Sequence, residues 1–143
     1  MSEVNPKLLT TDYLRLVLRD QTPADNLLLD DHEFDDAEIN NAIEQCIDIW
    51  NEGPPVFCNH QYDRSTFPWR YYLAIGACSK LMRSAALRFQ RNTLQVNVGQ
   101  AAVDDQNKAG AYMNLFKQLD AEFREWVLHK KIEIQQTECW GSV

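Results

Sequence analysis

Thr93-Leu94-Gln95-Val96-Asn97-Val98-Gly99 is the stretch that decides the fold, because it joins the two longest helical patterns of the chain. Its alternation of apolar and polar residues predicts a strand. Helical hairpins usually close with about two to eight polar residues. We therefore expect residues 93–103 to form a strand-like or hairpin insert that pairs with something outside its own two helices.

The patterns on either side of this insert predict long helices. The first begins near Ser65-Thr66, with Pro68 in its first turn, and runs to about Arg91. Its two faces differ: Tyr71, Ile75, Cys78, Leu81, Met82, Ala85 and Phe89 form an apolar face, and Arg70, Lys80, Arg83, Arg88 and Arg91 form a basic face. Trp69 and Leu73 fall on the basic face, so we expect them to be exposed in a single subunit.

The second long helix is predicted from Asp104 or Asp105 to about Lys131. Its apolar stripe recurs at bundle spacing and comprises Ala109, Tyr112, Met113, Phe116, Leu119, Phe123, Trp126 and Val127. Ala109-Gly110-Ala111 permits a close contact between helices, and Lys130-Lys131 suits the helix C-terminus. The alternation Ile132-Glu133-Ile134 predicts that the C-terminal tail, residues 132–143, is extended.

Two shorter helices precede this pair. One is predicted from Thr10 or Thr11 to Arg19, followed by a loop that reaches Glu33. The other begins with a capping box, in which Asp35 is the N-cap and Glu38 stands three residues later, and it ends at Gly53-Pro54-Pro55. The fold class is therefore all-α: one domain, residues 1–143, containing a bundle of about four helices.

Charge is distributed unevenly along the chain, whose formal net charge is −7. Residues 1–63 contain 14 acidic and 3 basic residues, whereas residues 64–143 contain 7 acidic and 11 basic ones. Two interpretations remain open: the halves form two differently charged faces of one monomer, or they pair head to tail between subunits, as in a ring. The overall acidity argues against general binding to nucleic acid or to anionic membranes.

Catalytic or metal-binding patterns are not predicted from this sequence. His32, His60 and His129 lie far apart, and nothing connects them to an activated Ser or Cys. Cys58-Asn59-His60 has no second ligand pair at zinc-site spacing, and the acidic stretch 30–36 lacks the spacing and central Gly of a calcium loop. We expect no cofactor, no metal and no enzymatic activity.

Cellular location is suggested by other features. Cys46 and Cys78 fall on apolar faces, which is typical of small buried side chains in a reducing compartment. The N-terminus has no signal-peptide pattern, and no apolar run approaches the length needed to span a membrane. We therefore expect a soluble protein that is made inside the cell.

The order of these elements resembles the head–tail connector, or adaptor, proteins of tailed bacteriophages. The resemblance runs from about Phe34 to the C-terminus. It comprises a capped helix, a long Arg-rich helix, the insert Asn92-Thr93-Leu94-Gln95-Val96-Asn97-Val98-Gly99, the run Val103-Asp104-Asp105-Gln106, an Ala-Gly-Ala-Tyr helix and an extended tail. This is a pattern of architecture and not a strict motif.

The resemblance implies a structural virion protein of the neck, made in the host cytoplasm. Subunits of such proteins form a ring, usually of twelve copies, beneath the portal, and they dock the tail or the next neck ring. DNA passes through the channel without sequence-specific binding, and no membrane is involved. Residues that we expect at subunit or partner interfaces are Trp69, Leu73, Arg83, Arg88, Arg91, Leu94, Val96, Val98, Ile132, Ile134 and Trp140.

Two other functional classes remain open. The chain could be a stand-alone helical module that binds or regulates a partner, or, less consistently with its scattered histidines, a helical hydrolase with its site inside the bundle. A ring-forming protein and a stand-alone module differ in their oligomeric state.

Overall fold

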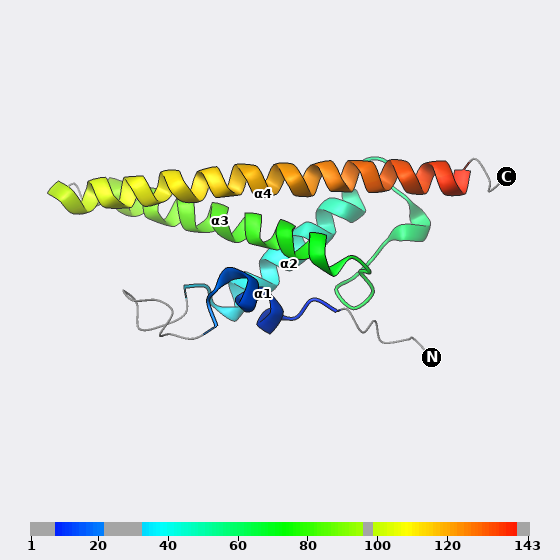
Figure 1. Ribbon diagram of the computed structural model, residues 1–143, viewed down its shortest axis with the longest axis horizontal. Coiled ribbons are helices and arrows are strands. Elements are labelled where there is room, and N and C mark those ends of the chain that lie inside the picture. The colour runs from blue at the N-terminus through cyan, green and yellow to red at the C-terminus, as the bar shows by residue number, and fades with distance from the viewer. Residues whose placement is uncertain (1–7, 22–32, 96–98, 140–143) are drawn as a thin grey trace.

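The computed structural model describes residues 8–21, 33–95 and 99–139, and its elements are all helical (Figure 1). Four α-helices follow one another: α1 (Thr11–Leu18), α2 (Asp36–Glu52), α3 (Arg70–Gln95) and α4 (Gly99–Cys139). A short 3-10 helix, η2 (Cys58–His60), lies between α2 and α3. The predicted all-α class is confirmed.

Helix α1 is short because both of its ends are capped within two turns. The Thr10 side chain accepts a hydrogen bond from the backbone N–H of Tyr13 at 3.1 Å. At the other end Arg19 adopts a left-handed conformation (φ 59°), and its N–H bonds to the carbonyl groups of Arg15 and Leu16. These contacts satisfy groups that a helix terminus otherwise leaves unpaired.

Helix α2 begins and ends where the sequence predicts. The Asp35 carboxylate accepts the Glu38 N–H at 2.7 Å, and the Glu38 carboxylate accepts the Asp35 N–H at 3.3 Å, which completes the capping box. At the C-terminal end the N–H of Gly53 donates to the carbonyl of Ile49 at 3.0 Å. The capping box and the stop at Gly53 are both confirmed.

Helices α3 and α4 form a long antiparallel hairpin that runs the length of the molecule (Figure 1). Helix α4 has 41 residues, which corresponds to roughly 60 Å at 1.5 Å per residue. Helix α2 crosses behind α3, and α1 lies on the opposite side from α4 (Figure 1). Helix α3 is therefore the central element and contacts all three of the others.

The predicted insert and the predicted extended tail are both wrong in the residues that the structure describes. Residues 93–95 continue α3, residues 99–103 belong to α4, and residues 132–139 continue α4. Residues 96–98 and 140–143 lie outside the described part of the chain. These ranges contain three of the predicted interface residues: Val96, Val98 and Trp140. A helix pairs its backbone groups internally, so these segments need no sheet edge, and short apolar alternations do not by themselves separate strand from helix.

One glycine marks the point where three helices approach most closely. A Cβ atom on Gly76 of α3 would lie 2.8 Å from the Phe123 ring of α4 and 2.9 Å from the Cys46 sulfur of α2. A Cβ on Gly110 would meet nothing within 4 Å. The sequence Ala109-Gly110-Ala111 permits a close helix contact, but none is made at Gly110; a close contact occurs at Gly76.

Candidate interaction surfaces

Trp69 and Leu73 lie in the core region, contrary to the expectation that they are exposed. Leu73 is only 1% exposed. The Trp69 ring is half-buried and lies 5.0 Å from the Trp50 ring and 5.6 Å from the Trp126 ring, centroid to centroid. Phe67 and Tyr62 complete this aromatic cluster. The segment after α2 and the C-terminal half of α4 cover a side of α3 that the charge pattern assigns to solvent, so these two residues are not proposed as an interface.

Lys80, on the predicted basic face, is also buried. Its amine donates to the Asp120 carboxylate of α4 at 3.1 Å, and Arg124 donates to the other oxygen of Asp120 at 2.8 Å. Burial alone would raise the pKa of Asp120, but the hydrogen bonds from Arg124 and Lys80 outweigh burial and hold that pKa below its usual value. This contact ties α3 to α4.

Arg88 pairs with an acidic residue of its own subunit. Its guanidinium lies 3.7 Å from the Glu33 carboxylate and donates to the Glu33 carbonyl at 3.4 Å. The Tyr112 hydroxyl of α4 donates to the same carboxylate at 2.6 Å, and burial, with Glu33 next, raises the pKa of Tyr112. Part of the charge asymmetry along the chain is therefore neutralised within one subunit.

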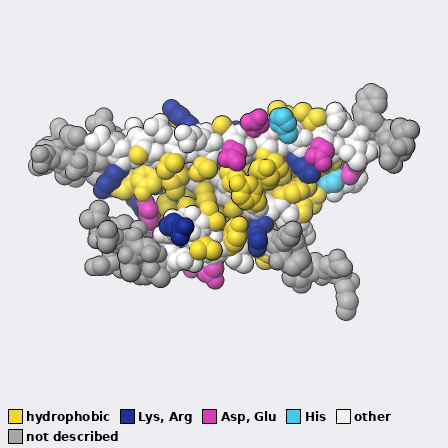
Figure 2. Space-filling model, viewed as in Figure 1, with side chains coloured by type: hydrophobic (Ala, Val, Ile, Leu, Met, Phe, Trp, Pro, Cys, Tyr) yellow, Lys and Arg dark blue, Asp and Glu magenta, His cyan; other side chains and the backbone are white. Residues whose placement is uncertain are grey.

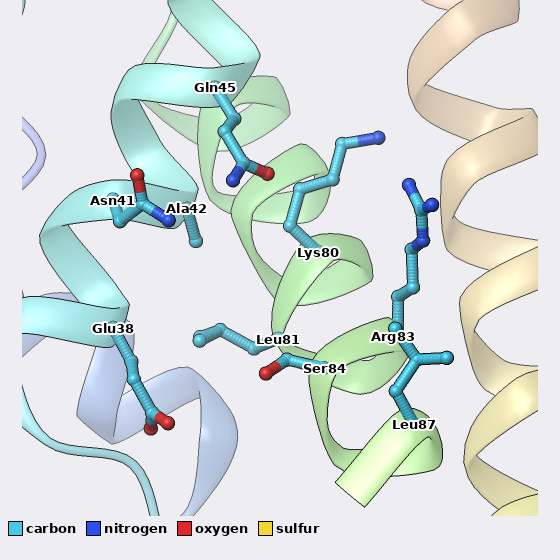
Figure 3. Close-up of a pocket in the computed structure, with 9 residues that line it drawn as sticks. All are labelled: Glu38, Asn41, Ala42, Gln45, Lys80, Leu81, Arg83, Ser84 and Leu87. Carbon is cyan, nitrogen blue, oxygen red and sulfur yellow. The ribbon is translucent and has the colours of Figure 1, made fainter.

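Arg83 and Arg91 of α3 are exposed, as predicted. They contribute to a hollow of about 330 Å³ and a second one of about 510 Å³, which share Glu38, Ser84 and Leu87 and so form one groove. We call this the α2–α3 groove. Figure 3 shows Asn41 and Gln45 extending from α2, and Lys80 and Arg83 extending from α3 toward α4. Its lining combines charged side chains of both signs, Glu38, Lys80 and Arg83 among them, with the apolar side chains of Ala42, Leu81 and the exposed Leu87.

An apolar groove lies on another side of α3, between α1 and α4. It has a volume of about 340 Å³, and we call it the α1–α3–α4 groove. Its lining is almost entirely hydrophobic: Tyr13, Val17, Leu18, Tyr71, Ala74, Ile75, Cys78, Met82 and Leu119. Figure 2 shows hydrophobic side chains gathered along this face of the molecule, below α4. Tyr71 is 61% exposed and Val17 is 49% exposed, so the surface is open to solvent.

The sequence predicts the apolar face of this groove but not its exposure. Helix α1 has eight residues and α3 has 26, so α1 covers roughly 12 Å of a helix that is roughly 39 Å long. Cys78, Leu81, Met82 and Ala85 of this face are buried, Ile75 and Phe89 are half-buried, and Tyr71 is exposed. The difference in length between the two predicted helices is the signal in the sequence from which this exposed surface could have been predicted.

The C-terminal turns of α4 are fastened to the segment that follows α2. Lys131 is buried, and its amine donates to the carbonyl groups of Trp50 at 2.6 Å, of Pro55 at 3.1 Å and of Gly53. Burial lowers the pKa of Lys131. Lys131 therefore caps α2 and not its own helix, which continues for eight more residues to Cys139.

Ile134 is half-buried against the core, whereas Ile132 is 43% exposed on the outer side of α4. Of the predicted interface residues on α3 and α4, Arg83, Arg91 and Ile132 thus present their side chains to solvent. Leu94 belongs to α3, and its side chain is outside the described part of the structure.

Among the described residues, His60 makes a contact that resembles a catalytic arrangement. Its ring nitrogens lie 2.8 Å from the Tyr62 hydroxyl and 2.8 Å from the Glu138 carboxylate of α4. Burial, and after it Glu138, raises the pKa of Tyr62. A raised pKa keeps the hydroxyl protonated and so does not activate it as a nucleophile. The contact joins the end of α4 to the loop around η2.

Comparison of the chain with known protein families, with curated proteins and with solved structures gave no match. Among the described residues, no three His, Cys, Asp or Glu side chains are grouped so that they could hold a metal ion. No helix in the described part of the chain combines the length and the apolar character that crossing a membrane requires. The two grooves are therefore the surfaces on which a functional proposal rests.

Proposed function

We propose that this chain is a structural subunit of the bacteriophage neck, forming a ring beneath the portal that joins the head to the tail. The observation that carries the proposal is the uncovered apolar groove along the α3–α4 hairpin. Exposed apolar side chains gathered at a groove, as Tyr71 and Val17 are here, mark a candidate contact site, and a ring covers such a site on every subunit. The resemblance of the element order to head–tail connectors supplies the class of assembly.

Several features of the folded chain fit this role. Lys80, Lys131 and Arg88 each form a hydrogen bond or an ion pair that connects one helix to a distant segment of the chain. The net charge of −7 suits a channel wall along which DNA slides, because like charges repel. The partners would be the portal protein on one side and a tail or further neck-ring protein on the other, in a ring that is dodecameric if it follows the resemblance.

A second candidate function is a stand-alone helical module that binds a partner helix. The observation in its favour is the same α1–α3–α4 groove, in which Tyr71 of α3 is exposed between α1 and α4. Apolar grooves between helices commonly receive an amphipathic helix through anchors at helical spacing. The two candidates differ in whether the partner is the portal.

The proposed function predicts binding to the portal protein encoded in the same genome. When both proteins are produced together, we expect a complex that purifies as one species and shows the rotational symmetry of the portal in electron micrographs. The physical reason is that the ring multiplies a modest contact by the number of subunits, so that avidity holds the complex together.

The control for this experiment is a portal from an unrelated phage, which should not bind. A folded chain that remains separate from its own portal, as judged by sizing with light scattering, would contradict the neck function. Under the alternative function the chain would stay monomeric in the presence of the portal.

A further inference from the structure

The α1–α3–α4 groove has a shape that a single ridge of apolar side chains could fill. Its floor is α3, with Tyr71, Ile75 and Met82, and its walls are α1 and α4. Leu115, one turn before Leu119 on α4, extends the apolar surface and is 46% exposed. An occupant must therefore be a narrow convex element, such as one face of a helix.

Such a ridge exists on the outer side of α4. Leu128 is 53% exposed and Ile132 is 43% exposed, and they stand four residues apart, which places them one above the other on one helix face. Phe123 and Val127 of the same helix are buried against α3. We call Leu128 and Ile132 the α4 ridge; it points away from the core of its own subunit.

Charges beside the groove and beside the ridge are complementary. Arg70 stands at the α1 side of the groove, with its guanidinium carbon 4.4 Å from the Tyr13 ring centroid, and the exposed Glu122 stands on the α4 side, one turn beyond Leu119. At 100° per residue, Arg124 and Glu125 flank the ridge on its two sides, and both are exposed; within its own chain Arg124 bonds to Asp120, and Glu125 lies 3.8 Å from His129. One orientation of the ridge brings Glu125 toward Arg70 and Arg124 toward Glu122, and complementary charges of this kind select orientation.

We propose that the α1–α3–α4 groove of one subunit receives the α4 ridge of a second copy of this chain. This assignment rests on the proposed function, since a ring needs one such contact between each pair of neighbours. Groove and ridge are different surfaces of the subunit, so the contact is heterologous and can close into a ring. Pairing groove with groove would instead set two concave surfaces against each other and leave a void.

Two variants that each remove one side of the contact test this proposal. Tyr71→Asp disables the groove, and Leu128→Asp combined with Ile132→Asp disables the ridge; all three positions are exposed, so folding should be retained. We expect wild-type chains to self-associate in sedimentation experiments at protein concentrations up to about 1 mM, a range in which weak association is detectable. Each variant alone should bind itself at least about tenfold more weakly, because one of its two surfaces is lost.

Mixing the two variants gives the decisive result. The intact ridge of the groove variant should enter the intact groove of the ridge variant, giving a one-to-one complex that grows no further. Val56→Asp is the matched control, because Val56 is 57% exposed but belongs to neither surface, and it should associate like the wild type. Val17→Asp gives a second groove variant on α1 should Tyr71→Asp fail to fold.

Three outcomes would overturn the proposal: wild-type chains that stay monomeric throughout, a ridge variant that self-associates as strongly as the wild type, and a mixture that does not pair. The portal is absent from this experiment. Intact self-association with no portal binding would therefore contradict the neck function and leave this contact standing, and the reverse pattern would contradict this contact alone.

Discussion

At the scale of single residues, Trp69 illustrates how a position on a charged helix face can still be structural. It lies just before α3, and its ring packs on Trp50 of α2, Tyr62 of the connecting loop and Trp126 of α4. Three separate segments therefore meet on one indole. Its contribution is to stability and not to assembly.

Trp69→Ala should destabilise the fold by about 3 kcal/mol, because removing a large ring from an aromatic cluster forfeits its buried area and leaves a cavity. Urea unfolding followed by circular dichroism measures this change. Tyr71→Ala is the control: its ring is 61% exposed, so the expected change is below about 0.5 kcal/mol. An unchanged midpoint for Trp69→Ala would show that the indole is dispensable to the fold.

Buried positions could be predicted from the sequence where a helix has one buried face and one exposed face, as α2 has. On α2 the apolar stripe from Ile39 to Trp50 is buried as the spacing indicates, and Cys46 and Cys78 are buried as predicted. Helix α3 has partners on three sides, so Leu73 and Lys80 are buried although they lie on its basic face. Helical periodicity gives the angle of a side chain but not the number of neighbours around the helix.

At the scale of elements, the ends of helices with caps could be predicted, and the ends without caps could not. Asp35 and Gly53 carry local signals, and α2 begins and ends beside them. The stretch after Lys131 combines apolar alternation with good helix formers such as Glu and Gln, so its local sequence does not separate strand from helix clearly. The stretch after Asn92 contains only Leu94 and Gln95 as good helix formers, so its sequence favours the predicted strand. In the structure residues 132–139 are helical, and this part of α4 contacts a distant segment of the chain through Glu138 and His60.

Gly76 of α3 and Gly110 of α4 predict opposite results for the same substitution. Gly76→Ala should destabilise by about 1–3 kcal/mol, because its Cβ would overlap Phe123 and Cys46 where three helices meet. Gly110→Ala should stabilise by roughly 0.5–1 kcal/mol, because its Cβ meets open space and alanine is the better helix former. Thermal unfolding of both variants beside the wild type tests the pair; a stabilising Gly76→Ala would contradict the packing around Gly76.

At the scale of the whole molecule, the helices share one hydrophobic core and are linked by polar contacts between distant segments. Arg15 of α1 pairs with Asp20 at 3.1 Å and with Asp36 of α2 at 2.8 Å, and Asp20 also accepts the N–H groups of Glu33 and Phe34. Lys80 and Lys131 connect α4 to α3 and to the end of α2. These links predict that α2, α3 and α4 unfold as one unit, which is what a single domain requires.

Two buried thiols can report on this cooperativity. Burial raises the pKa of both Cys46 on α2 and Cys78 on α3 from 9.0 to about 12, so both remain protonated and unreactive in the folded chain at pH 8. Because the folded pKa values exceed the unfolded ones, these groups lose their contribution to stability as the pH rises from about 9 to about 12. Labelling below that range must therefore proceed through opening of the fold.

In a Cys58→Ser, Cys139→Ser background, we expect Cys46 and Cys78 to react with a thiol reagent at a common rate that rises with urea in parallel. That result follows if both become accessible only when the shared core opens. The exposed Cys58 of the wild-type chain serves as the control and should react at once. Cys78 also lines the α1–α3–α4 groove, so faster labelling at Cys78 than at Cys46 would mean that the groove opens by itself and that the core is not one cooperative unit.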